Sequence, residues 1–225
     1  MNVFTFWEGK MPAYIELCMR TWKVPHTILN YANLNDFTRL DTKLFKRFTL
    51  PQIADIVRAH VLRDCGGYWL DADTIMLSDE LPKANMLGDP DTRVNSIGFL
   101  RTEKGSDMFV KWAEYQDEVM NADTVEVRWD LLGNKFTDQY VRDHSEIKID
   151  FIRNCFPELR VEGDAPRKQK YCEFYFNRFY DLSDIEDTDL LMLHNSWTPT
   201  WYKNLTMNEV LVLERTLSNI LREVV

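Results

Sequence analysis

The stretch PQIADIVRAHVLRDCGGYWLDADTIML, residues 51–77, decides the fold of this chain. A proline, which is favourable at the first position of a helix, precedes apolar side chains at helical spacing in residues 52–64. A glycine pair then ends the helix, as glycines commonly do just past a helix C-terminus. Residues 68–70 are too apolar for an exposed loop, and Asp71 and Asp73 follow them. We therefore predict a helix, a glycine turn and a buried strand that delivers two carboxylates.

The residues before this stretch predict the first half of a parallel sheet. Residues 2–7 and 26–31 are rich in β-branched and aromatic side chains and are expected to be strands. Residues 12–23 between them have a buried stripe at helical spacing, and residues 33–50 are expected to form short helical pieces and loops. In such sheets ligands collect at the carboxyl ends of strands, so Trp7 is a candidate either for nucleotide contact or for core packing.

The remainder of the chain alternates in the same way. We expect a polar loop after residue 78 and then the following elements: strand 95–100, helix 107–120, a helix ending near residue 144, strand 147–152, loop 157–169, strand 171–180, strand 190–193 and a capped helix over 206–225. The fold class is thus α/β, a single domain over residues 1–225 with a mainly parallel central sheet flanked by helices. Its expected parts are a ligand-binding half (1–77), a second half (78–200) and a C-terminal packing helix (206–225).

The composition limits the classes of function. The chain has 225 residues, 45% of them apolar, which is enough for a sizeable core. With 27 Lys and Arg against 36 Asp and Glu, the net charge is −9, which argues against nucleic acid as a partner. No secretory signal and no apolar run long enough to span a bilayer is apparent, so we expect a cytoplasmic protein without a membrane span.

The two aspartates point to a metal. Carboxylates at positions i and i+2 of a strand face the same way and can share one hard cation, which takes oxygen ligands. The same tripeptide pattern recurs at 89–91 and 187–189, so it is weak evidence without its context. His194 follows the late strand and is either a structural residue or a further metal ligand.

The helix before the aspartates carries a second pair of candidate residues. Asp55 and Arg58 are three positions apart and share one side of that helix. They could form an exposed ion pair, or they could hold sugar hydroxyls and phosphate. The residues alone favour the ion pair.

These segments resemble a known family. Ala54-Asp55-Ile56-Val57-Arg58 followed by Gly66-Gly67-Tyr68-Trp69-Leu70-Asp71-Ala72-Asp73 is similar to the pattern of metal-dependent GT-A glycosyltransferases with an Asp-x-Asp motif. The likeness is greatest to the branch with capsular-polysaccharide transferases, yeast initiating mannosyltransferases and clostridial glucosylating toxins. Phe6-Trp7-Glu8-Gly9 looks like the start of that family, and His194-Asn195-Ser196-Trp197 looks like its closing element. The resemblance implies a GT-A (Rossmann-like) fold.

The resemblance also implies a metal site. Asp73 would bind Mn²⁺ or Mg²⁺ directly, and Asp71 would bind the metal or the ribose and a metal-bound water. His194, or Asn195 and Ser196 beside it, would complete the coordination.

The donor would be a UDP- or GDP-linked sugar. Asp55 and Arg58 would hold its sugar, and Trp7 would contact the base or ribose. Trp197, with Ser196 beside it, would cover the diphosphate. These roles make Asp55, Arg58, Asp71 and Asp73 the expected catalytic set.

The implied reaction transfers the sugar to a hydroxyl of a glycan, a lipid-linked sugar or a protein, with retention of configuration. Two other functions remain open. A phosphohydrolase of the haloacid-dehalogenase type also carries Asp-x-Asp after an apolar strand, although normally on its first strand. A non-catalytic domain could keep the fold without binding metal or nucleotide.

Overall fold

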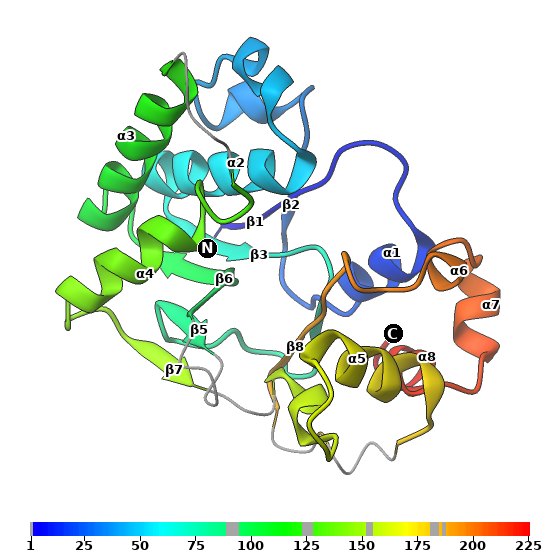
Figure 1. Ribbon diagram of the computed structural model, residues 1–225. Helices are drawn as coiled ribbons and strands as arrows, with labels where there is room; N and C mark the ends of the chain where they lie inside the picture. The colour runs from blue at the N-terminus through cyan, green and yellow to red at the C-terminus, as the bar shows by residue number, and fades with distance from the viewer. Residues whose placement is uncertain (1, 89–94, 123–127, 152–154, 181–184, 186–187) are drawn as a thin grey trace. The chain divides into compact units, whose positions relative to one another are not determined.

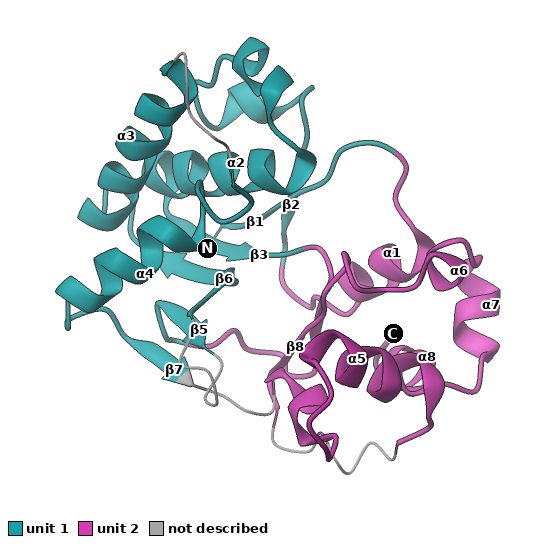
Figure 2. Ribbon diagram, in the orientation of Figure 1, with its two compact units in different colours: residues 1–9, 25–71, 83–151 teal, residues 10–24, 72–82, 152–225 magenta. Residues whose placement is uncertain are grey.

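The computed structural model describes residues 2–88, 95–122, 128–151, 155–180, 185 and 188–225. Two compact units, coloured separately in Figure 2, make up the chain. Unit 1 comprises residues 1–9, 25–71 and 83–151, and unit 2 comprises residues 10–24, 72–82 and 152–225. The prediction of a single domain stays a prediction. No described helix is long and apolar enough to cross a membrane.

Unit 1 is built on a six-stranded sheet with the order β2-β1-β3-β6-β5-β7 (Figure 1). Its strands are β1 (Val3–Phe6), β2 (Thr27–Leu29), β3 (Gly67–Leu70), β5 (Met86–Gly88), β6 (Asn95–Thr102) and β7 (Ile149–Phe151). The pairings β1–β2, β1–β3 and β5–β7 are parallel, whereas β6 runs antiparallel to both β3 and β5. The predicted α/β class and mainly parallel sheet are confirmed.

The helices of unit 1 are α2 (Leu50–Cys65), α3 (Asp107–Asn121) and α4 (Asn134–Asp143), with short 3₁₀ helices η1 (Leu34–Asp36) and η2 (Thr42–Arg47). Helix α2 begins with a capping box formed by Thr49 and Gln52, and it ends at Gly66, whose φ of +65° favours glycine. It packs against α3, β1 and β3, and buries Ile56 and Val57 in the core. This packing fixes the helix that carries Asp55 and Arg58.

Unit 2 contains a two-stranded antiparallel sheet of β4 (Thr74–Met76) and β8 (Leu190–Met192). Its helices are α1 (Ala13–Arg20), η4 (Pro157–Arg160), α5 (Arg167–Cys172), a π-helical turn η5 (Glu173–Asn177), α6 (Thr200–Lys203), α7 (Met207–Val212) and α8 (Thr216–Val224). Helix α1 packs on β4, and after it Trp22 donates a hydrogen bond from Nε1 to the carbonyl of Thr74 at 2.7 Å. The unit thereby joins segments that are far apart in the sequence.

The strand predicted over residues 171–180 is wrong, because this segment finishes α5 and forms the turn η5. Tyr171 and Tyr175, four residues apart, place their ring centroids 4.8 Å from each other. Tertiary packing of aromatic rings at helical spacing has overridden their intrinsic preference for strands. The predicted loop 157–169 is also partly wrong, since it holds η4 and the start of α5.

The single C-terminal helix predicted over 206–225 is two helices, α7 and α8. The predicted capping box of Thr206 and Glu209 is confirmed. The helix is interrupted between Val212 and Thr216. The Thr216 side chain donates a hydrogen bond to the carbonyl of Arg178 and accepts one from the amide of Tyr180. Strand β5 lies in the segment after residue 78 that was predicted to be a polar loop, so that prediction is partly wrong.

The two aspartates do not share one strand, contrary to prediction. Strand β3 ends at Leu70, β4 begins at Thr74, and the two strands belong to different sheets and different units. The alternation of side chains along a strand therefore does not orient Asp71 and Asp73 alike. The similar tripeptide at 89–91 and residue 187 of the other one lie outside the described residues.

Candidate functional site

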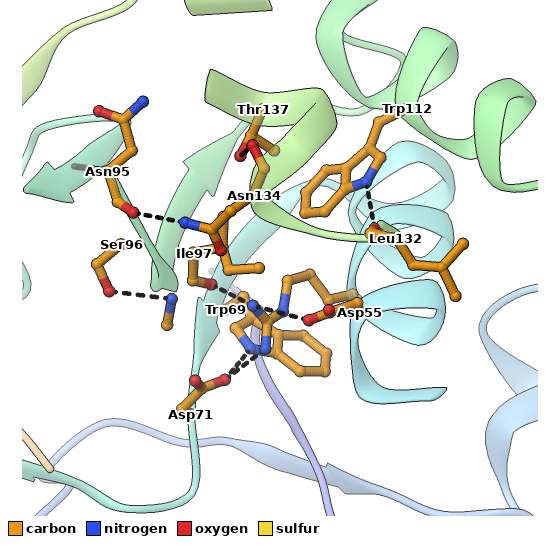
Figure 3. Close-up of polar contacts among 12 residues, drawn as sticks. Asp55, Trp69, Asp71, Asn95, Ser96, Ile97, Trp112, Leu132, Asn134 and Thr137 are labelled. Atoms are coloured by element: carbon orange, nitrogen blue, oxygen red, sulfur yellow. Dashed lines mark hydrogen bonds and ion pairs between the residues drawn. The ribbon is translucent and has the colours of Figure 1, made fainter. Parts of the chain in front are cut away.

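Arg58 is the centre of the polar cluster in unit 1. Its side chain is only 4% exposed, although it projects from α2 with a permanent positive charge. Nη2 donates to Asp71 Oδ1 at 2.7 Å, and Nη1 donates to the carbonyl of Ile97 at 2.7 Å (Figure 3). The guanidinium carbon also lies 5.0 Å from the centre of the Trp69 ring. Strands β3 and β6 and their ends thus supply every one of these contacts.

Asp71 is held firmly on one side. Its Oδ1 accepts hydrogen bonds from Arg58 and from Trp69 Nε1, the latter at 2.8 Å (Figure 3). Its backbone amide donates to the carbonyl of Gly98 at 2.8 Å. The side chain is nevertheless 39% exposed. An oriented and accessible carboxylate at the end of a central strand is suited to contact a ligand.

Asp55 forms the buried end of the same cluster. Its Oδ1 lies 3.4 Å from Arg58 Nη1. The two side chains are 14% and 4% exposed, so this is a buried pair and not the exposed ion pair that the sequence favoured. Burial raises the pKa of Asp55 to about 7, against the opposing effect of Arg58 and with a further rise from Asp71. Near neutral pH this carboxyl therefore exchanges between a form that accepts and a form that donates hydrogen bonds.

The loop of residues 128–133 closes over Asp55 and was missed by sequence reasoning. A Cβ atom on Gly133 would lie 2.7 Å from Asp55 Oδ2, so only glycine leaves room there. The carbonyl of Leu132 accepts from Trp112 Nε1 (Figure 3). It also accepts from Gln116 Nε2, which donates in addition to the carbonyl of Asp55. The glycine in this polar stretch was the only signal that the sequence offered.

Trp7 lies in unit 1 just after β1 and is half-buried. Its backbone amide donates to the carbonyl of Leu29 at 2.9 Å. Its indole Nε1 is buried and has no hydrogen-bond partner among the described residues. A buried donor in that condition is costly unless a ligand accepts from it.

Asp73 belongs to unit 2 and lies just before β4. Its Oδ2 accepts a 2.6 Å hydrogen bond from the backbone amide of Asn195. The side-chain Oδ1 of Asn195 in turn accepts from the hydroxyl of Tyr14 at 2.5 Å. Tyr14 is fully buried on α1, and burial, together with the charge of Asp73, raises the pKa of its hydroxyl. Sequence reasoning missed Tyr14, although it lies four residues before Cys18 on the buried stripe.

His194 lies among aromatic rings and a buried acid in unit 2. Its ring centroid is 4.0 Å from that of Trp197 and 5.5 Å from that of Tyr171. Its Nε2 lies 3.9 Å from an oxygen of Glu158, which is fully buried and ion-paired with Arg167 at 3.0 Å. These contacts give His194 a packing role beside any other it has.

Trp197 and Ser196 complete the late segment. The Trp197 ring centre lies 5.9 Å from the guanidinium carbon of Arg167, and Ser196 is exposed. Among the described residues, no group of three or more His, Cys, Asp or Glu side chains is arranged to hold a metal ion. The predicted metal ligands Asp71, Asp73 and His194 stay a prediction.

Comparison with known proteins gives two findings. A family model described as "Capsular polysaccharide synthesis protein" matches residues 1–178, which include Asp55, Arg58, Asp71 and Asp73 but end before His194. A solved structure titled "PaToxG Glycosyltransferase" is 15% identical, with a TM-score of 0.41, and the alignment covers 63% of this chain and 67% of that one. No curated protein matches the chain.

Proposed function

Because the chain belongs to the capsular polysaccharide synthesis protein family, we propose that it is a glycosyltransferase of the GT-A class. It moves a sugar from a UDP- or GDP-linked donor to a hydroxyl of a growing glycan, and it retains the configuration of the sugar. The observation that carries this proposal is the contact of the buried Asp55 and Arg58 with the accessible carboxylate of Asp71 in unit 1. A guanidinium that is held between two carboxylates offers fixed hydrogen-bonding groups to sugar hydroxyls and phosphate.

Each residue of unit 1 has a defined part in donor binding. Asp55, with a pKa of about 7, can both donate to and accept from hydroxyl groups of the sugar. Arg58 and Trp69 orient the carboxylate of Asp71, which stays accessible. Trp7 offers its buried indole N–H to an oxygen of the ribose or base. These groups orient the sugar before the bond to phosphate breaks.

The carboxylate oxygens of Asp71 and Asp73 are suitable ligands for a hard divalent cation such as Mn²⁺ or Mg²⁺. One residue separates Asp71 from Asp73, so the backbone keeps their Cα atoms within about 7.6 Å of each other. Mg²⁺ is usually held by one or two carboxylates, waters and substrate phosphates rather than by an all-protein cage. A bound cation would offset the negative charge that develops on the leaving diphosphate.

In unit 2, Asn195 and Tyr14 orient the Asp73 carboxylate for binding the cation. The amide of Asn195 fixes one oxygen of the Asp73 carboxylate, and Tyr14 fixes the side chain of Asn195. Because His194 packs against Glu158, we favour Asn195 and the exposed Ser196 as the further contacts to metal or diphosphate. Trp197 covers the diphosphate in this proposal.

The test is hydrolysis of a panel of UDP- and GDP-linked hexoses with and without Mn²⁺ or Mg²⁺. We expect hydrolysis of one donor only when metal is present, and none of a generic phosphate ester. Arg58→Lys should lower the rate at least a hundredfold, because a lysine cannot make the two separated contacts of the guanidinium. Arg63→Lys on the same helix is the matched control and should stay within twofold of the wild type.

Since Arg58 is buried, its replacement could also disturb the fold. Asp71→Asn provides the second variant, because its amide oxygen can still accept from Arg58 and Trp69 while the charge is removed. Rates of both variants are measured at a temperature at which thermal unfolding shows each to be folded. A wild-type protein that hydrolyses no nucleotide sugar with either metal contradicts the proposed function. Cleavage of the phosphate ester instead would favour the phosphohydrolase.

A further inference from the structure

The loop of residues 128–133 is anchored along the side of α2 that bears Asp55. Near its start, the carbonyl of Arg128 accepts a hydrogen bond from Gln52 Nε2 at 3.2 Å. At its end, Gly133 lies against the Asp55 carboxylate. Gln52 and Asp55 are three residues apart and so lie on one side of the helix. The loop is therefore held at both ends beside the proposed sugar-binding group.

Trp129 is at the exposed corner of this loop. The amide of Leu131 donates to the carbonyl of Arg128 at 3.2 Å, which closes a turn around Trp129. Trp129 is 78% exposed, the largest value among the exposed large apolar residues of the described chain. Leaving an indole in water forgoes the stabilisation that its burial would bring. An exposed indole on an anchored turn is a feature that ligand contact would explain.

The surroundings of Trp129 are polar. Its neighbours in sequence are Arg128, whose side chain is 70% exposed, and Asp130, which lies 3.6 Å from the Arg128 Nε. A flat apolar ring beside a cation and a carboxylate complements a sugar ring, which has an apolar C–H face and a rim of hydroxyls. A single ring is much smaller than the roughly 800 Å² that each partner buries in a stable protein interface. A saccharide fits this surface better than a protein does.

We propose that Trp129 is a stacking platform for a saccharide ring of the acceptor glycan. The inference rests on the proposed glycosyltransferase function and names the part of the substrate that this loop contacts. Asp55, on the inner side of the loop, holds the donor sugar, and Trp129, at its outer corner, holds the acceptor. In this proposal the loop, which is anchored on α2, fixes the positions of the donor sugar and the acceptor sugar with respect to that helix.

The first test compares transfer with hydrolysis. The probes are aryl glycosides of mono- and disaccharides of glucose, galactose, mannose and N-acetylglucosamine, with the donor identified by hydrolysis. In Trp129→Ala, the KM for the acceptor should rise about tenfold, which lowers the ratio of transfer to hydrolysis. Trp129→Phe should keep an acceptor KM close to that of the wild type, because phenylalanine retains an aromatic face. Trp201→Ala, which removes a half-exposed indole from unit 2, is the matched control and should keep the wild-type ratio.

The second test needs no activity. Titration of the same saccharides into the wild type should change the tryptophan fluorescence, and Trp129→Phe should lose that change while still binding the sugar by calorimetry. A saccharide that binds without any nucleotide-sugar hydrolysis would overturn the proposed function but support the platform. An unchanged acceptor KM in Trp129→Ala, or no binding of any saccharide to the wild type, would overturn the platform. So would a change of oligomeric state in that variant.

Discussion

Replacement of Gly133 by alanine tests the contact between the 128–133 loop and Asp55. The φ of Gly133 is −121° and its ψ is −107°, so its backbone is not in the left-handed region. The new Cβ would lie 2.7 Å from both Asp55 Oδ2 and Ile97 Cδ1, which is 3.4 − 2.7 = 0.7 Å short of ordinary contact. Overpacking of this kind costs about 1–3 kcal/mol. For a chain of this size we expect the melting temperature to fall by roughly 2–12 °C.

The assay combines thermal unfolding with donor hydrolysis. If the space were adequate, Gly133→Ala would suffer no clash with these two side chains, and its melting temperature would stay near that of the wild type. A second background isolates the contact with the Asp55 carboxylate. In an Asp55→Ala background one of the two clashes is absent, so the destabilisation by Gly133→Ala should be smaller by at least about 0.5 kcal/mol. An unchanged or higher melting temperature, or equal effects in both backgrounds, would refute the proposed contact.

Two further predictions follow from the polar clusters. Tyr14→Phe removes the hydroxyl that donates to Asn195 but keeps the ring. The apparent Kd for Mn²⁺ in the presence of UDP, measured by calorimetry, should therefore rise about two- to tenfold. An unchanged Kd would contradict the role of Tyr14. Asp55→Asn should gain stability over the wild type as pH rises from 5 to 8. The folded pKa of about 7 exceeds the unfolded value of 3.8, so the wild-type carboxyl binds more protons when folded and its ionisation destabilises the fold as pH rises. A difference in melting temperature that stays constant over this range would show that the pKa of Asp55 is not raised.

The parts of the fold that depend on local signals could be predicted from the sequence. Helix α2 has a proline at its start, a regular apolar stripe and glycines at its end, and each of these signals acts within a few residues. The presence of Asp55 and Arg58 on one side of it follows from their spacing. Their burial could not be predicted, because it depends on the loop around Gly133 and on the carbonyl of Ile97, which are distant in sequence.

Other features depend on contacts that no local pattern reveals. The sequence from Leu70 to Thr74 looks like one continuous strand with a polar interruption, yet β3 pairs with β6 and β4 pairs with β8. The choice between these partners is made by strands that come later in the chain. The hydrogen bond from Asn195 to Asp73 likewise joins residues that are 122 positions apart. Only the three-dimensional structure relates them.

The pairing of β4 with β8 has a consequence for the synthesis of the protein. Met76 ends β4 and Leu190 begins β8, so the two strands lie 190 − 76 = 114 positions apart. At about 5–20 residues per second, a ribosome needs roughly 6–23 s to supply the partner strand. Until then, strand β4, with the apolar Ile75 and Met76, presents an unpaired edge, which favours aggregation. Ribosome-bound chains that stop before residue 190 should therefore depend on chaperones more than the finished protein does.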